Sequence, residues 1–332
     1  MTRTAATTTG TRLRGHRRLR AGLALVTAAT SALALVVPAP ASAAAVTVRR
    51  ATSNLTVPCG SNGTILSTDW YFPAVASPTG VVWVQHGFSS SKSSIAALAN
   101  HIAANTSAIV VAPTISSNFL SLNGCWINGL AMHQAVARMF GDRFSALQSS
   151  ASAAATLAGA GRITLPSRFV LTGHSAGGNL ATSAAGYTTQ ISSGGSLVSS
   201  RLRGVVMYDG VDNGGAIGTG LDRLSGANYR RVWTIAAPDS SCNATGSGTR
   251  LLKSKRPSEF IGVRLVNGTH VDATGSANIA CGTPRAENVT AVRTLAASWI
   301  SNLLAGTPAS ALLATTAAGT SSAVGSATAV TL

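Results

Sequence analysis

This 332-residue chain has few acidic side chains and few aromatic ones. Asp and Glu number 9 against 25 Lys and Arg, and Phe, Trp and Tyr make up 5% of the residues. One apolar run, residues 21–37, approaches the length of a membrane span, and it is shorter than the roughly 20 residues that a transmembrane helix needs. The chain also lacks internal repeats and nucleic-acid-binding motifs. We therefore expect a soluble protein that does not bind nucleic acid.

The apolar run belongs to a predicted secretory signal at residues 1–43. Five arginines lie between Arg12 and Arg20, the apolar run follows, and residues 38–43 supply small side chains of the A-x-A type. This order is typical of a signal peptide, with cleavage expected after Ala43. We expect a secreted, extracellular protein.

Part of the net charge of +16 leaves with the signal. Six of the 25 basic residues and none of the nine acids precede residue 44, so the mature chain has a net charge of +10. The basic residues are scattered apart from 253–256. A solvated basic surface is the simplest interpretation, and association with an anionic envelope surface is the alternative. We expect a monomer.

The four cysteines are Cys59, Cys125, Cys242 and Cys281. Their spacing fits no metal-ligand pattern, and an even number in an exported chain predicts two disulfides. Three pairings are open at this point. We expect no metal and no cofactor.

Short apolar runs alternate with helix-compatible segments over most of the remaining chain. The predicted strands are residues 80–85, 107–112, 168–172, 204–208, 231–236 and 260–266; the predicted helical segments are 94–105, 129–157, 178–185 and 287–304. This alternation predicts an α/β domain at residues 44–305, with a mostly parallel sheet covered on both faces. Residues 306–332 are rich in Ala, Ser and Thr and uncharged, which predicts a low-complexity tail that does not pack.

Residues 173–177, Gly-His-Ser-Ala-Gly, have the G-x-S-x-G form of a nucleophile elbow. A predicted strand precedes them and a predicted helix follows, which is the setting that this motif requires. A glycine-rich loop that happens to contain serine is the alternative. We predict Ser175 as a nucleophile at the carboxyl edge of the sheet, where such sheets place their chemistry.

A serine nucleophile needs a base, and the base needs an orienting acid. Of the six histidines, His270 follows the last predicted strand in a loop with no apolar face to bury, and we predict it as the base. In the order Ser, acid, His, the acid lies between Ser175 and His270. Asp239 ends the strand that precedes the histidine's strand and is favoured; Asp209 and Asp212, one strand earlier, are its competitors.

Backbone donors are also expected for the oxyanion of the tetrahedral intermediate. The amide of Ala176 follows the nucleophile directly. The amide of Phe88, in the loop after an early strand, is expected to be the second donor.

With these motifs in place, the sequence resembles the α/β hydrolases, and more narrowly the secreted bacterial cutinase-like polyester hydrolases and lipases. The resemblance covers residues 69–304 and is carried by segments 70–73, 85–95, 173–178, 237–239 and 268–270. It implies an α/β-hydrolase fold and a Ser–His–Asp triad, and it supports Asp239 as the acid. Some members also join the loops of the acid and the histidine by a disulfide, which implies Cys242–Cys281 and leaves Cys59–Cys125.

Two departures affect the expected substrate. Polyester hydrolases usually carry a methionine after the nucleophile, where this chain has Ala176, and a tryptophan where it has residues 207–209. About twenty residues, 210–229, separate two late strands, which leaves no room for a large cap domain. An open site suits apolar or polymeric esters, and Phe88, Trp126 and Tyr208 are candidate wall residues.

The sequence therefore predicts a secreted serine ester hydrolase, an esterase or lipase, that acts through an acyl-enzyme. A cell-envelope acyltransferase with the same triad is one alternative. A catalytically inactive α/β-hydrolase scaffold that binds envelope polymers is another.

Overall fold

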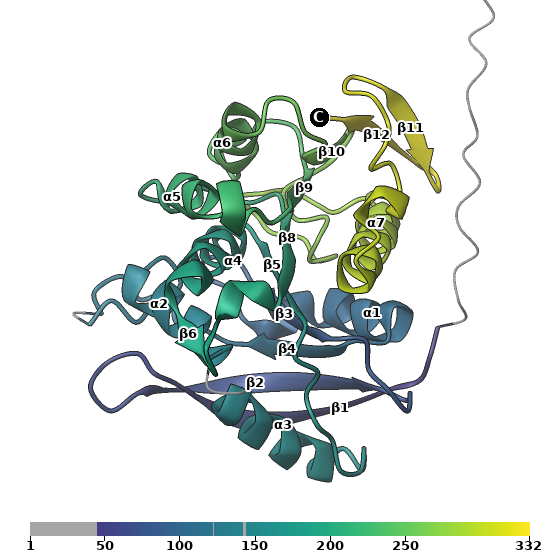
Figure 1. The fold of residues 1–332 in the computed structure, drawn as a ribbon. Helices are drawn as coiled ribbons and strands as arrows, with labels where there is room; N and C mark the ends of the chain where they lie inside the picture. Colours follow the sequence, from purple (N-terminus) through teal and green to yellow (C-terminus); the bar gives the residue numbers. More distant parts are fainter. Residues whose placement is uncertain (1–44, 122, 142–143) are drawn as a thin grey trace, which may run out of the picture. The chain divides into compact units, whose positions relative to one another are not determined.

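The computed structural model describes residues 45–121, 123–141 and 144–332, so the predicted signal segment lies outside the described residues. These residues contain a ten-stranded mixed sheet with helices on both faces (Figure 1). The strand order is β1-β2-β4-β3-β5-β8-β9-β10-β12-β11, and the strands from β4 to β10 in this order are parallel. The prediction of a mostly parallel sheet is confirmed.

The order of elements along the chain follows the predicted alternation. The strands of the large sheet are β1 (Val48–Val57), β2 (Thr64–Pro73), β3 (Val81–Gln85), β4 (Ile109–Pro113), β5 (Phe169–His174), β8 (Leu202–Tyr208), β9 (Val232–Ala236), β10 (Gly262–Leu265), β11 (Ser321–Val324) and β12 (Ala327–Thr331). The helices are α1 (Ala96–Thr106), α2 (Leu130–Met139), α3 (Ser145–Leu157), α4 (Ala176–Tyr187), α5 (Ala216–Arg223), α6 (Ser247–Lys255) and α7 (Ala286–Ala305). Each predicted strand is present to within two residues at either end, and the helical region expected over 129–157 forms two helices.

Two hydrophobic cores lie on opposite faces of the sheet. The first is shared by α2, α3, α4 and α5, and includes Trp83 of β3 and Leu171 of β5. The second is shared by α1 and α7, and includes Val84 of β3 and Val170 of β5. Neighbouring residues of one strand enter opposite cores because side chains alternate across a sheet. Burial on both faces explains why these strands have uninterrupted apolar runs.

The carboxyl ends of the parallel strands form one edge of the sheet. β5 lies between β3 and β8, with Gln85 opposite Gly173 and Tyr208 opposite His174. The segment between β8 and β9 contains the short helix α5, a 3-10 turn at Gly226–Asn228 and no cap domain, as predicted. None of the helices in the described part of the chain is long and apolar enough to cross a bilayer.

The prediction of an unpacked tail at residues 306–332 is wrong. β12 pairs antiparallel with β10, β11 pairs with β12, and the two strands extend the sheet beside α7 (Figure 1). Ala329 is fully buried, and Leu312 exchanges hydrogen bonds with Ser298 and Trp299 of α7 at 2.8 Å each. Small side chains of alternating burial are sufficient to pack against an existing sheet, so low complexity does not imply disorder here. Gly325-Ser326, with Gly325 at a φ of 61°, is a two-residue hairpin signal that could have indicated these strands and that the sequence analysis did not use.

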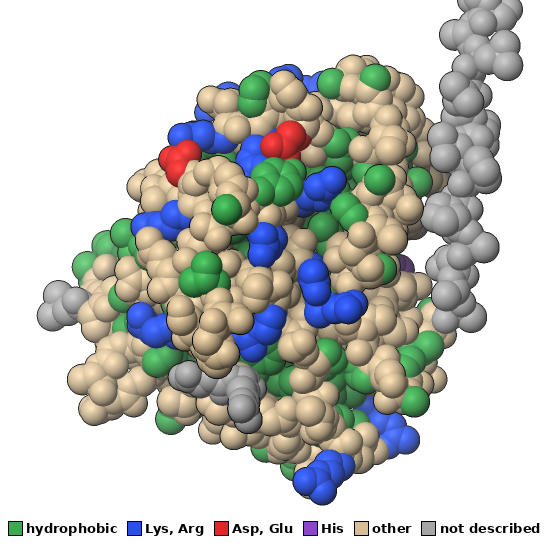
Figure 2. All heavy atoms as spheres, in the orientation of Figure 1, with side chains coloured by type: hydrophobic (Ala, Val, Ile, Leu, Met, Phe, Trp, Pro, Cys, Tyr) green, Lys and Arg blue, Asp and Glu red, His purple; other side chains and the backbone are tan. Residues whose placement is uncertain are grey.

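On the face seen in Figure 2, basic side chains are spread out rather than gathered into one patch. Figure 2 shows Lys and Arg distributed over one face, with acidic side chains only near its upper end. Near β2, the buried carboxylate of Asp69 pairs with Arg50 and with Lys92, the latter at 2.6 Å. These ion pairs keep the pKa of Asp69 below its ordinary value, although burial opposes them.

Because the hairpin is packed, we expect substitutions at two neighbouring positions to differ in their effect on the free energy of unfolding. Ala329→Asp should lower the free energy of unfolding by about 3 kcal/mol or more, because it buries an unpaired carboxylate. Thr328→Asp, at an exposed position of the same strand, should change it by less than about 0.5 kcal/mol. Urea unfolding of the two variants measures both values. Equal, small effects would mean that the hairpin is not part of the folded domain.

Candidate active site

Ser175 occupies a strained turn between β5 and α4. Its φ of 56° and ψ of −122° lie where a residue with a side chain is rarely found, a conformation that costs about 1–3 kcal/mol. The predicted strand–turn–helix setting of a nucleophile elbow is therefore present. The residue is largely buried, with 9% of its surface exposed.

The glycines of the motif allow the turn to pack tightly. A Cβ at Gly173 would lie 2.2 Å from the carbonyl of Gly177, and one at Gly177 would lie 2.5 Å from the carbonyl oxygens of Gln85 and His86. Both distances are impossible for real atoms, so only glycine fits at either position. The elbow is thus pressed against the end of β3.

Backbone hydrogen bonds also fix the elbow to the segment after β8. The amide of Ser175 donates to the carbonyl of Tyr208, and the amide of Val211 donates to the carbonyl of Ser175, both at 3.1 Å. Asp209, between these two partners, has a φ of 48°. The nucleophile and the residue after β8 are therefore held together through the main chain.

The structure pairs His270 with Asp209. The Nδ1 atom of His270 lies 2.6 Å from Oδ2 of Asp209, and both side chains are buried. The carboxylate accepts, so Nδ1 carries the proton and Nε2 presents a lone pair. His270 therefore has the partner and the tautomer that a general base requires. No hydrogen bond joins the Ser175 hydroxyl to His270 among the described residues; such bonds are often long without substrate.

The prediction of Asp239 as the acid is wrong in this structure. Its carboxylate is 64% exposed and faces Arg250 of α6 at 3.6 Å. After β9, Pro238 and the turn that follows direct Asp239 over Gly246, toward solvent. The competitor Asp209 occupies the position instead, while Asp212 accepts the amides of Gly215 and Ile217 at the start of α5.

Two residues that the sequence analysis did not identify hold the His270 loop. His174 Nε2 lies 2.7 Å from the carbonyl oxygen of His270, so the elbow itself donates to the loop of the base. The buried carboxylate of Asp272 accepts hydrogen bonds from the amides of Thr269, at 2.7 Å, and Arg285, at 3.0 Å. His174 was part of the recognised motif, but its bond to the His270 carbonyl was not predicted from the sequence.

A third residue that was not identified contacts the acid directly. The side-chain amide of Asn243, in the loop after β9, lies 3.1 Å from Oδ2 of Asp209. The amide of Ala237 donates to Oδ1 at 3.1 Å. Asp209 therefore accepts hydrogen bonds from two parts of the β9 loop as well as from His270.

The expected oxyanion donors are Phe88, in a well-anchored loop, and Ala176, at the start of a helix. His86 accepts the amide of Ile115 on Nε2 at 3.0 Å, and its Nδ1 bonds to the carbonyl of Gly87 at 2.7 Å, which fixes the loop before Phe88. Ala176 is the first residue of α4. Among the described residues, the amides of Phe88 and Ala176 donate to no protein acceptor, so both can receive an external oxygen.

The candidate wall residues have different surroundings. Tyr208 is excluded, because its side chain is buried in the core beneath α1 and α7; strand alternation directs it away from the elbow. Trp126 is half-buried against the opposite core. Phe88 is 47% exposed beside the elbow, and Phe119 and Leu120, in the loop after β4, are more exposed still.

Both predicted disulfides, Cys59–Cys125 and Cys242–Cys281, are present. The first anchors the loop after β4 to the end of β1. The second joins the β9 loop, which contains Asn243, to the segment that follows His270.

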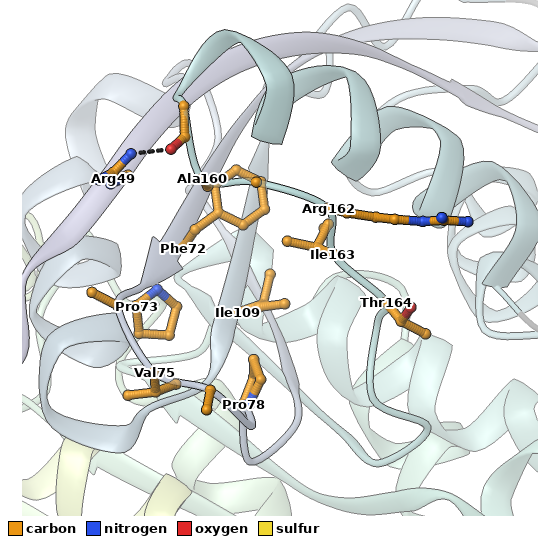
Figure 3. A pocket seen from close by; sticks show the side chains of 14 residues that line it. Arg49, Phe72, Pro73, Val75, Pro78, Ile109, Ala160, Arg162, Ile163 and Thr164 are labelled. Atoms are coloured by element: carbon orange, nitrogen blue, oxygen red, sulfur yellow. Dashed lines mark hydrogen bonds between the residues drawn. The ribbon is translucent and has the colours of Figure 1, made fainter.

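A cavity of about 710 Å³ lies away from this arrangement. It is lined by the end of β2, the start of β4 and residues 159–164 (Figure 3), and therefore lies at the edge of the sheet opposite to Ser175. Arg49 donates to the carbonyl of Gly159, and Arg162 extends away from the other side chains. The cavity has none of the residues of the candidate active site, so its volume does not bear on the chemistry.

Buried histidines make the folded protein sensitive to acid. Burial lowers the pKa of His86 and of His133 to about 4, and burial together with the neighbouring His270 and His86 lowers that of His174 to about 3. In the unfolded chain each pKa is about 6.5. Below pH 6.5 the unfolded chain binds protons that the folded chain excludes, so stability is lost as the pH falls.

We expect the free energy of unfolding to decrease by about 2 kcal/mol per buried histidine between pH 7 and pH 5. His133→Gln should make this decrease smaller by about 2 kcal/mol. Urea unfolding at the two pH values measures it. An unchanged decrease in the variant would show that His133 is not held neutral.

Comparison with known proteins supports the fold. No protein-family model matches the chain, and no curated protein sequence matches it. A thermostable esterase from Pseudomonas putida has a TM-score of 0.51 at 14% identity, over 78% of this chain and 84% of that chain. A mutant of the esterase rPPE has a TM-score of 0.52 at 13% identity, over 77% and 83%. At such identities the likeness concerns architecture alone, and the chain has the α/β-hydrolase fold.

Proposed function

We propose that this protein is a secreted carboxylic-ester hydrolase that works through an acyl-enzyme on Ser175. The observation that carries the proposal is the buried hydrogen bond of 2.6 Å between His270 and Asp209, beside a strained Ser175. A serine hydroxyl becomes an effective nucleophile only when an oriented base takes its proton. The fold's similarity to two esterase structures agrees with this chemistry.

In the proposed reaction, Nε2 of His270 removes the hydroxyl proton while Ser175 Oγ attacks the ester carbonyl carbon. Asp209 keeps the ring oriented and stabilises the imidazolium that forms. The amides of Phe88 and Ala176 stabilise the oxyanion. His270 then returns the proton to the departing alcohol, and a water molecule, activated by the same base, hydrolyses the acyl-enzyme.

The surroundings of Ser175 suit bulky, apolar esters or polymers. The segment between β8 and β9 supplies α5 and a 3-10 turn and does not cover the elbow with a domain. Phe88, Phe119 and Leu120, on the loops after β3 and β4, expose apolar side chains at the same edge of the sheet. An ester with a long acyl chain would bury this apolar surface on binding.

Ser175→Ala should lower kcat for p-nitrophenyl esters by about 10⁶-fold, and should abolish covalent labelling by a fluorophosphonate.

A series of p-nitrophenyl esters from acetate to palmitate tests the open site, since activity should persist with the long acyl chains. Labelling without hydrolysis would favour the acyltransferase, tested by adding alcohol acceptors. Absence of labelling in the wild type would contradict a serine nucleophile.

Asp209→Asn should lower kcat by about 10³- to 10⁴-fold, because the amide no longer holds the catalytic tautomer of His270. Asp239→Asn is the matched control, since its carboxylate is exposed and pairs with Arg250 rather than with His270, and kcat should stay at the wild-type value. Steady-state kinetics with one ester measures both. The reverse result would assign the acid to Asp239.

A further inference from the structure

We infer that Asn243 is a positioning residue for the acid Asp209, held in place by the Cys242–Cys281 disulfide. The inference rests on the ester-hydrolase mechanism proposed above. Asn243 lies in the loop after β9, where the sequence predicted the acid itself. This loop thus contributes a neutral donor to a carboxylate that comes from the neighbouring strand β8.

The contacts of Asn243 Nδ2 are shared between the acid and the loop. Nδ2 lies 3.1 Å from Oδ2 and 3.3 Å from Oδ1 of Asp209, and 2.9 Å from the carbonyl oxygen of Pro238. One N–H can therefore bridge both carboxylate oxygens while the other is satisfied by Pro238. Since Oδ2 also accepts from His270, the amide fixes the plane of the carboxylate that orients the base.

The orientation of the amide is set by its own oxygen. Asn243 Oδ1 accepts the backbone amides of Ser240, at 2.8 Å, and Gly246, at 2.9 Å. Two N–H donors require an oxygen at that position, so Nδ2 must face Asp209. The side chain is fully buried. Asn243-Ala-Thr245 matches a glycosylation sequence, but the buried amide makes its hydrogen bonds inside the protein.

The charged groups around Asp209 explain why a neutral donor is suited to position 243. The His270 ring faces Asp209 directly, and His174 beside it remains neutral because its pKa is lowered to about 3 by burial. The second buried carboxylate, Asp272, is satisfied by the amides of Thr269 and Arg285. A further carboxylate at Asn243 would place two anions against one imidazole.

The disulfide holds the loop that carries Asn243. Cys242 precedes Asn243 and is bonded to Cys281, beyond His270. Elsewhere in the β9 loop, residues 239–241 and 244–245 are exposed. The covalent bond therefore couples the position of the amide to the segment that carries the base.

The test compares Asn243→Ala and Asn243→Asp with Asp239→Asn, the control from the same loop. Asn243→Ala should lower kcat about 10- to 100-fold with KM nearly unchanged, and should slow fluorophosphonate labelling of Ser175 by a similar factor. Asn243→Asp should move the acidic limb of kcat/KM to higher pH, because a second carboxylate favours the protonated ring. A merely structural role would scale the rate equally at all pH values. Thermal unfolding confirms that each variant is folded.

The role of the disulfide is tested in the wild type and in Asn243→Ala. Replacing Cys242 and Cys281 by Ser should slow labelling in the wild type and add little in Asn243→Ala, since both changes act through the same amide. If the cysteine replacements and Asn243→Ala slow labelling additively, the disulfide does not act through Asn243. Wild-type kcat and an unmoved pH profile in both Asn243 variants, with Asp209→Asn inactive, would overturn the inference and leave the proposed function intact. Full activity in Asp209→Asn would contradict the proposed mechanism itself.

Discussion

The hydrogen bond between Asp209 and His270 depends on three segments that are far apart in the sequence. Asp209 follows β8, His270 follows β10, and the β9 loop between them supplies the donors Ala237 and Asn243. The elbow joins this assembly through the carbonyl of Tyr208 and through His174. An isolated carboxylate in the interior would be costly, so the buried acid requires these donors, and the donors require the loops to keep their positions.

The strain at Ser175 is maintained by the same packing. Its positive φ persists because Gly173 and Gly177 allow the turn to press against β3 and because the backbone of Ser175 is bonded to the segment after β8. Strain of this kind is stable only where the surroundings over-determine the conformation. The parallel sheet supplies that rigidity, since its strands are buried on both faces by the two cores.

Much of the fold could be predicted because buried parallel strands leave apolar runs that helices separate. The elbow, His270 and both disulfides were also found from local motifs or from the family resemblance. The acid was assigned to the wrong strand because Asp209 and Asp239 both follow strands at the same sheet edge. Their difference lies in side-chain direction, which Pro238 and the contacts of Asn243 decide. Asn243, His174 and Asp272 act through tertiary contacts that no spacing rule reveals. The terminal hairpin was missed because its small side chains pack only against a sheet already formed.

The terminal hairpin also places a new strand at the border of the sheet. β11 is the last strand in the order and contains only Ser, Ala and Val. An edge strand without charge has no electrostatic protection against pairing with a strand of another molecule. Repulsion between molecules then depends on the net positive charge of the whole domain, and added salt screens this repulsion. We therefore expect association through β11 to increase with ionic strength.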